Sequence, residues 1–309
     1  MENLEAAVGI GYWLRWQVVV CALILILPAT IALRLLRRRH KDPIDPSHFW
    51  VPSWRGLHPR WLLFYRAFAF ASMAFLLYQT VATFGFFVFF FYTQWTFALV
   101  MVYFALGTLV SAQGCLWSSR SPFAQCGETD RFLKKDPDET NSHDKEQACV
   151  EQHLGLSENL MHIVYQTCAG AVMLTDIVFW CLLLPFMTGE NFQLTLLIGC
   201  MHSVNAIFLF LDSALNKLPF SWYGLVYFIL WSCVYVAFQW ILHACCYTWW
   251  PYPFLDLSTP WAPFWYFALA LVHIPCYGIY VLLIKLKDGI LSRMFTEAYV
   301  RVTMEKKGT

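Results

Sequence analysis

Charged residues are scarce in this chain: Asp, Glu, Lys and Arg make up 13% of its 309 residues. A soluble domain carries about 25% charged residues, because water must wet its surface. The formal net charge is only +1, which gives no sign of a nucleic-acid partner. The shortage of charge therefore argues against an ordinary soluble domain and against a nucleic-acid-binding protein.

Several short motifs of enzyme chemistry are absent as well. The chain has no His-Glu-x-x-His zinc motif, no Gly-x-Ser-x-Gly nucleophile turn and no glycine-rich phosphate loop. Its cysteines include no Cys-x-x-Cys pair, and most of them lie inside apolar runs, where cysteine usually acts as a small apolar residue. We therefore expect no metal and no cofactor.

Apolar sequence dominates instead, because 59% of the residues are hydrophobic and they occur in long runs. A helix of about 20 residues crosses the hydrocarbon core of a bilayer and satisfies its own backbone hydrogen bonds there. We therefore predict an all-α, polytopic transmembrane helical bundle that forms a single domain over residues 1–309. The expected spans are residues 12–36, 61–85, 88–115, 160–186, 193–215, 221–245 and 262–284.

The boundary between the second and third spans has to be inferred from length. From Trp61 to Cys115 the chain is apolar, with Arg66 as the one interior charge. About 55 residues are too many for one crossing and suit two. We predict that the break lies near Gly85, and the polar step that ends at Gln94 is the alternative.

Basic residues are distributed unevenly between the two sides of this seven-span arrangement. Every Lys and Arg except Arg15 falls in or beside segments on one side. Because cytosolic loops are enriched in Lys and Arg, we predict an N-terminus outside and a C-terminus in the cytosol. The cytosolic side then holds a flexible polar loop at 117–158 and a tail at 285–309. We expect a multi-pass protein of the plasma membrane or an endomembrane, and its oligomeric state stays open.

Ionisable side chains inside a membrane are costly, so each one is a candidate functional residue. The fifth span carries His202, Asn205 and Asp212 within an arc of about 80° on one helix face, which must look into the bundle. Asp176 lies well inside the fourth span, and His243 lies near the end of the sixth. We expect these side chains to line a substrate site or to join helices in a polar network.

Asp212 and His273 are the remaining ionisable positions to consider. Asp212 is near the cytosolic end of its span, where it could simply pair with Lys217. His273 lies in the seventh span and is a candidate for the same reason as the others.

The third span carries Thr96, which shares a helix face with Tyr103. If the span starts just after Gly85, Thr96 lies about as deep in the membrane as His202. If the span starts at Gln94, the two differ in depth by roughly 10 Å and could not meet. A threonine near a helix start is more often a cap or an interface residue than a reactive group.

A set of scattered positions resembles a known family. The positions are the outer segment Trp249–Asp256, His243 before it, Trp95 and Thr96 in the third span, and His202-x-x-Asn205 in the fifth. In these positions, over about residues 60–285, the chain resembles the androgen-induced protein family. Its His-x-x-Asn order is similar to that of the rolling-stone-like branch of multispanning membrane proteins, which is tied to muscle-cell fusion.

The resemblance implies a lipid-ester hydrolase. In the androgen-induced family, a threonine and a histidine within the membrane hydrolyse fatty acid esters of hydroxy fatty acids. The matching residues are Thr96 as nucleophile and His202 as general base, with Asp212 at the family's spacing after the histidine. Membrane lipids would be the partners, and Tyr103, Asn205 and His243 are candidates for the oxyanion donor. The chain departs from the family at 198–199, where Ile and Gly replace an Asn-His pair.

Other functions remain open on this sequence. One alternative is a non-enzymatic membrane protein that acts in adhesion, fusion or scaffolding. A small-solute transporter or channel is another, with Asp176 and Asp212 along its polar pathway. A seven-helix G-protein-coupled receptor is disfavoured, because no Asp-Arg-Tyr follows the third span and no Asn-Pro-x-x-Tyr ends the seventh.

Overall fold

The computed structural model describes residues 9–38, 44–120, 140–187 and 194–300. Within these ranges the chain is almost entirely helical, and strand pairing is limited to two isolated bridges. The helices are α2 Ile10–Trp13, α3 Trp16–Arg38, η1 Pro46–Phe49, α4 Pro59–Phe84, η2 Phe86–Phe90, α5 Tyr92–Arg120, α6 Thr140–Ile177, η4 Val178–Leu183, α7 Leu184–Met187, α8 Leu196–Met201, α9 Val204–Leu215, η5 Trp222–Gly224, α10 Leu225–Cys245, η6 Pro253–Leu255 and α11 Ala262–Met294.

Seven helical segments in the described ranges are long and apolar enough to cross a membrane. They are Trp16–Arg38, Pro59–Phe84, Tyr92–Ser118, Gly155–Leu183, Leu196–Leu215, Trp222–Cys245 and Ala262–Met294. Each one overlaps one of the seven predicted spans, so the prediction of an all-α polytopic bundle is confirmed. The protein is therefore an integral, multi-pass membrane protein.

The break between the second and third spans lies where the sequence predicts it. Helix α4 ends at Phe84, and Gly85 follows with φ 75°, a backbone conformation that favours glycine. The Gly85 N–H donates to the Val81 carbonyl at 2.7 Å and closes the last turn. The short 3₁₀ helix η2 then intervenes, so that α5 begins only at Tyr92. The second span therefore ends at Gly85, as predicted. The regular helix of the third span begins only at Tyr92, close to the alternative position at Gln94.

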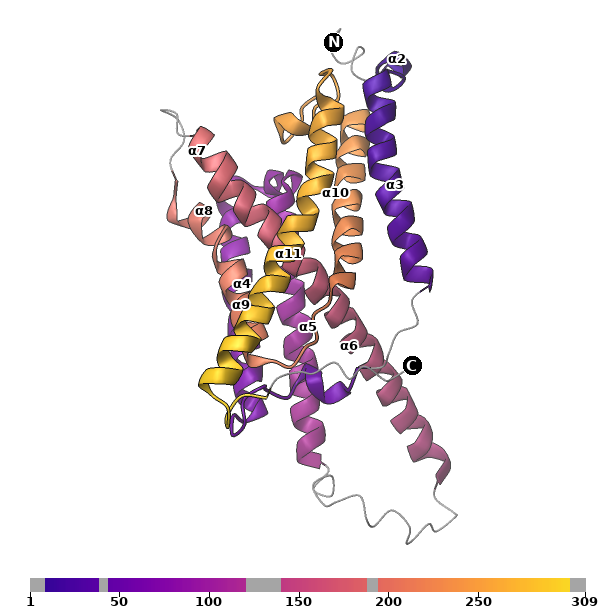
Figure 1. The fold of residues 1–309 in the computed structure, drawn as a ribbon. Helices are drawn as coiled ribbons and strands as arrows, with labels where there is room; N and C mark the ends of the chain where they lie inside the picture. The colour runs from indigo at the N-terminus through magenta and orange to yellow at the C-terminus, as the bar shows by residue number, and fades with distance from the viewer. Residues whose placement is uncertain (1–8, 39–43, 121–139, 188–193, 301–309) are drawn as a thin grey trace.

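Helix α6 is the centre of the bundle. It contacts α5, α9, α10 and α11, and Figure 1 shows it crossing the molecule obliquely. In its most apolar stretch 61% of the residues are buried, against 17% for α3. The outer helices instead carry many exposed large apolar side chains, such as Leu27 and Phe68. A lipid-facing surface around a central helix accounts for this difference.

Close helix packing around α6 depends on glycine. A Cβ atom on Gly170 would come within 2.3 Å of the Phe228 ring of α10. At that distance the ring would have to move, so only glycine lets the two helices approach this closely.

The expected cytosolic segments include more helix than the sequence suggested. Helix α5 continues to Arg120 and α6 begins at Thr140, so helix covers both ends of the predicted loop 117–158, whose residues 121–139 lie outside the described ranges. Helix α11 reaches Met294, past the predicted start of the tail, and Tyr299 pairs with Trp54.

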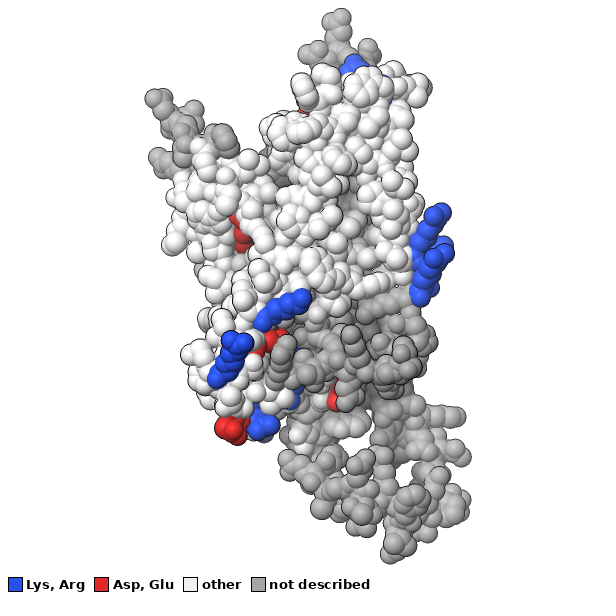
Figure 2. Space-filling model, viewed as in Figure 1, with Lys and Arg blue, Asp and Glu red and all other residues white. Residues whose placement is uncertain are grey.

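Helix α2 and the end of α11 lie at opposite ends of the molecule (Figure 1). Figure 2 shows one patch of Lys or Arg at the top of this view and the other visible ones from about mid-height downwards.

Candidate functional site

The fifth span is interrupted at His202. Helix α8 ends at Met201 and α9 begins at Val204, with His202 and Ser203 in a turn between them. The break removes a regular helix bond, because the Ala206 N–H donates to the side chain of Asn205 at 2.9 Å instead of the His202 carbonyl. That carbonyl accepts from Trp180 Nε1 at 2.8 Å. The side chain of Trp180, in the fourth span, thus gives the His202 carbonyl a hydrogen bond in place of the one that the interruption removes.

The fourth span is irregular at the same place. Residues Val178–Leu183 form a π-helical segment, η4, which is rare and occurs often at functional sites. It presents Phe179 flat against the His202 imidazole, with ring centroids 3.6 Å apart and an angle of 2° between the planes. Two irregular segments on neighbouring helices therefore hold one histidine in a fixed orientation.

A small polar cluster surrounds this histidine. Asp176 accepts hydrogen bonds from Asn205 Nδ2 and from the Thr175 hydroxyl, both at 3.3 Å. Its Oδ1 lies 3.9 Å from His202 Nδ1, beyond hydrogen-bond distance. His202 Nδ1 and Asp176 Oδ2 are buried and have no hydrogen-bond partner among the described residues. The expectation that Asp176 faces protein is confirmed, and the cluster retains unused hydrogen-bonding capacity.

His202 lies on the wall of two cavities. The large cavity has a volume of about 580 Å³ and lies between the end of α4, η2, the start of α5, α8 and residues 251–253. The small cavity, of about 100 Å³, reaches towards α10 and α11. Both are lined mainly by apolar side chains, and both include Thr93, Leu183, His202 and Tyr252. The histidine therefore borders two neighbouring apolar cavities inside the bundle.

Tyr252 adds a polar group to this wall from the loop between α10 and α11. Its hydroxyl oxygen accepts from the Tyr92 N–H at 3.1 Å, at the start of α5. Burial raises the pKa of Tyr252 to about 12, so the phenol stays protonated at neutral pH. It is therefore a neutral hydroxyl from a residue that lines the same cavities as His202.

Thr96 does not share this wall. It is fully buried and is absent from the lining of both cavities, whereas Thr93, about one turn earlier, lines both. The Thr96 side chain adjoins the Tyr92 hydroxyl. Thr93 therefore lines the two cavities that His202 also lines, and Thr96 lines neither of them.

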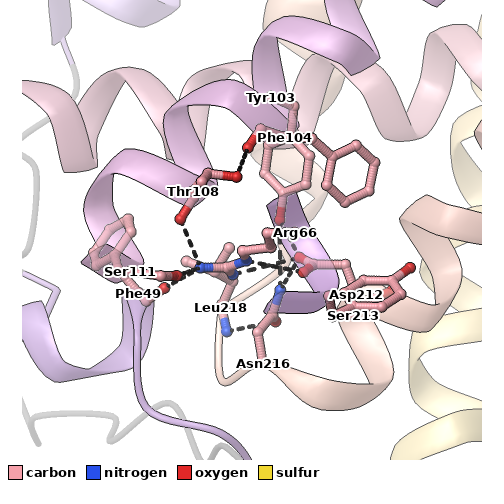
Figure 3. Close-up of polar contacts among 12 residues, drawn as sticks. Phe49, Arg66, Tyr103, Phe104, Thr108, Ser111, Asp212, Ser213, Asn216 and Leu218 are labelled. Carbon is pink, nitrogen blue, oxygen red and sulfur yellow. Dashed lines mark hydrogen bonds and ion pairs between the residues drawn. The ribbon is translucent and has the colours of Figure 1, made fainter. Parts of the chain in front are cut away.

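Asp212 and Tyr103 belong to a separate polar network, shown in Figure 3. Arg66 Nε donates to Asp212 Oδ1 at 2.9 Å, and its Nη1 donates to the Ser111 hydroxyl at 2.7 Å. The Tyr103 hydroxyl also donates to Asp212, and Asn216 Nδ2 does so at 2.6 Å. Arg66 and Asp212 are both completely buried. The ion pair joins α4 to α9, and Asp212 is paired with Arg66 instead of the Lys217 that the sequence suggested.

His243 is likewise separate from His202. It is buried and stacks on Trp250, with centroids 4.1 Å apart and an angle of 23° between the rings. Tyr12 and Trp13 pack on it as well. His243 does not line either of the two cavities. Its surroundings are those of an aromatic cluster at the end of the sixth span.

Several residues of the site gave no signal in the sequence. Phe179, Trp180 and Thr93 are ordinary residues of an aromatic-rich membrane protein, and only their tertiary positions distinguish them, whereas Tyr252 lies in the segment Trp249–Asp256 that carries the resemblance. Arg66 is different, because an ionisable residue inside a span is a candidate for a buried contact, but the sequence does not show which carboxylate it meets.

Comparison with protein-family models, with curated proteins and with solved structures finds no match to this chain. Nothing in these comparisons bears on the resemblance to the rolling-stone-like and androgen-induced proteins, which stays a prediction. Function has to be inferred from the site itself.

Proposed function

We propose that this protein hydrolyses lipid esters within the membrane. The large cavity would take the acyl chain of a substrate such as a fatty acid ester of a hydroxy fatty acid. Its volume of about 580 Å³ lies within the usual range of roughly 300–1,000 Å³ for ligand sites. The observation that carries the proposal is the presence of His202 on the wall of this apolar cavity.

His202 is suited to act as the general base. Its ring is held by the stack on Phe179, and its backbone is held by Trp180. A base that is fixed in this way loses little entropy when it meets a substrate. Asp176, 3.9 Å from Nδ1, can take up a hydrogen bond from the ring after a small movement.

The resemblance implies Thr96 as the nucleophile. In that form of the proposal, Thr96 Oγ1 attacks the ester carbonyl and its proton passes to His202. The proton then leaves with the alcohol, and water hydrolyses the acyl-threonine to the free acid. Tyr252 could donate to the developing oxyanion. Because Thr96 lies behind the cavity wall, the start of α5 would have to move for this attack.

Transport of a small solute is the second candidate, and one observation favours it. The break at His202 and Ser203 faces the π-helical segment η4. Interrupted helices of this kind hold substrates and ions near the middle of many transporters. In this alternative, Asp176, Asn205 and His202 would bind the solute and no bond would be cleaved.

A hydrolysis assay separates these two functions. Purified protein in lipid nanodiscs is given a fatty acid ester of a hydroxy fatty acid, and release of free acid is measured. We expect turnover by the wild type and a loss of about a hundredfold or more in His202→Ala. His58→Asn is the matched control, because His58 is an exposed cap of α4 and Asn can replace it. Absence of hydrolysis by the wild type would overturn the proposal and leave solute transport to be tested by uptake into vesicles.

A further inference from the structure

We propose that Ser232 is a nucleophile activated by His273, and that this pair, rather than Thr96 with His202, attacks the ester. The inference rests on the proposed function for its substrate class. Ser232 belongs to α10 and His273 to α11, so the pair joins two neighbouring spans. His273 Nε2 and the Ser232 hydroxyl oxygen are 2.8 Å apart.

The direction of this hydrogen bond follows from the other ring nitrogen. His273 Nδ1 lies 2.6 Å from the Leu269 carbonyl oxygen, which can only accept. A neutral imidazole carries one proton, so Nδ1 holds it and Nε2 presents a lone pair. The Ser232 hydroxyl must then donate to Nε2. This is the arrangement that activates a serine, with the Leu269 carbonyl in the orienting role that a carboxylate has elsewhere.

Tyr92 completes the constellation from the third span. Its hydroxyl lies 2.8 Å from the Ser232 oxygen. Because the Ser232 proton is already directed at His273, the Tyr92 hydroxyl is the donor in this contact. Each polar atom of the Ser232–His273 pair therefore has one defined role before substrate binds.

The pair also borders one of the two apolar cavities described above. Ser232 and His273 line the small cavity, whose wall also includes His202. They also line a third cavity, of about 100 Å³, between α3, α10 and α11. The small cavity and the large cavity share Thr93, Leu183, His202 and Tyr252 on their walls, so a substrate at Ser232 would lie beside the side chains that border the large cavity.

The chemical step is an ordinary acyl transfer. The Ser232 oxygen forms a bond to the ester carbonyl carbon while its proton passes to His273 Nε2. The carbon–oxygen bond of the ester breaks, and the alcohol leaves with that proton. Water then attacks the acyl-serine, gives one proton back through His273 to Ser232, and releases the free acid.

A bond that only joins two helices is the alternative for Ser232 and His273. Such an interhelical hydrogen bond contributes modestly to stability and gives the serine no special reactivity. Reactivity towards an alkyl fluorophosphonate is therefore the decisive measurement, because this probe forms a covalent adduct with an activated hydroxyl.

Wild-type protein in nanodiscs is treated with the fluorophosphonate, and the modified residue is identified by peptide mass spectrometry. We expect the adduct on Ser232. It should be absent in Ser232→Ala, and the labelling rate should fall by about a hundredfold or more in His273→Gln. Ester hydrolysis should be lost with the adduct. Cys233→Ala is the control, because it changes the adjacent residue and leaves the pair intact.

The remaining outcomes separate this inference from the proposed function. An adduct on Thr96, or normal ester hydrolysis by Ser232→Ala, overturns the role of Ser232 and leaves the hydrolase proposal standing. An adduct on Ser232 in a protein that cleaves no lipid ester overturns the hydrolase proposal and leaves the activated serine. The absence of both adduct and hydrolysis overturns both. Mapping on the wild type needs no variant, so a poorly folded mutant cannot obscure the result.

Discussion

The imidazole of His202 lies parallel to the ring of Phe179, with centroids 3.6 Å apart. The stack joins the interrupted fifth span to the π-helical part of the fourth. It fixes the angle at which the histidine borders the large cavity, so its loss should disturb the site more than the fold.

Replacement of this aromatic partner tests the orientation of the histidine. If His202 is the general base, Phe179→Leu should lower the rate of ester hydrolysis by between about 10-fold and 100-fold, because a small misplacement of a reacting group is costly. If Ser232 and His273 carry the reaction instead, the rate should stay close to that of the wild type. Phe68→Leu serves as the control, since Phe68 is 64% exposed on the lipid-facing side of α4. Equal rates for Phe179→Leu and wild type would show that the stack does not orient a reacting group.

The buried ion pair between Arg66 and Asp212 gives a prediction about stability. Arg66→Met leaves the carboxylate of Asp212 buried without its cation, and we expect a loss of about 3–5 kcal/mol in the free energy of unfolding. The double variant Arg66→Met/Asp212→Leu should lose less than the single variant, because no buried charge remains. Unfolding in mixed micelles, followed by circular dichroism, measures the free energy of unfolding of the two single variants and of the double variant.

The matched control for this pair is Arg60→Met. Arg60 lies in the first turn of α4 and is exposed, so its loss should change stability by less than about 1 kcal/mol. If the effects of Arg66→Met and Asp212→Leu simply add in the double variant, the pair is not coupled as the structure indicates.

The contact between α6 and α10 predicts a difference between two glycines. In Gly170→Ala the new methyl group would lie 2.3 Å from the Phe228 ring, so we expect a loss of about 1–3 kcal/mol. In Gly199→Ala the methyl group meets nothing within 4 Å. Alanine also favours helix there, so stability should be unchanged or slightly higher. Similar unfolding midpoints for the two variants would contradict the close packing of α6 on α10.

The distribution of basic residues predicts the orientation in the membrane. An epitope inserted between Lys134 and Lys145 should resist protease added to intact cells and should be cut after permeabilisation. An epitope placed before Trp13 should show the opposite behaviour. Cleavage of the first epitope in intact cells would reverse the proposed orientation.

The number and approximate limits of the spans could be predicted from the sequence alone. The length and hydropathy of each run are local properties, and they determine whether a segment can cross a bilayer. The break at Gly85 was predictable for the same reason, since about 55 apolar residues must divide once and a glycine permits the turn. That Asp176 faces protein follows from the cost of a carboxylate in lipid.

Which side chains meet could not be predicted, because the spans are apolar on almost every side and periodicity does not reveal the inward face. Arg66 and Asp212 are 146 positions apart, and Ser232 and His273 are 41 apart. Only the packing of the helices brings each pair together.

Thr93 and Thr96, both near the start of α5, show how small the deciding differences are. Thr93 lines the cavities of His202 and Thr96 does not. Residues three positions apart on a helix differ by about 60° around its axis. The sequence determined that a threonine would lie near the start of the third span, but the rotation of that helix was set by its neighbours. Packing against α4, α6 and η2 was therefore needed to decide which hydroxyl faces the cavity.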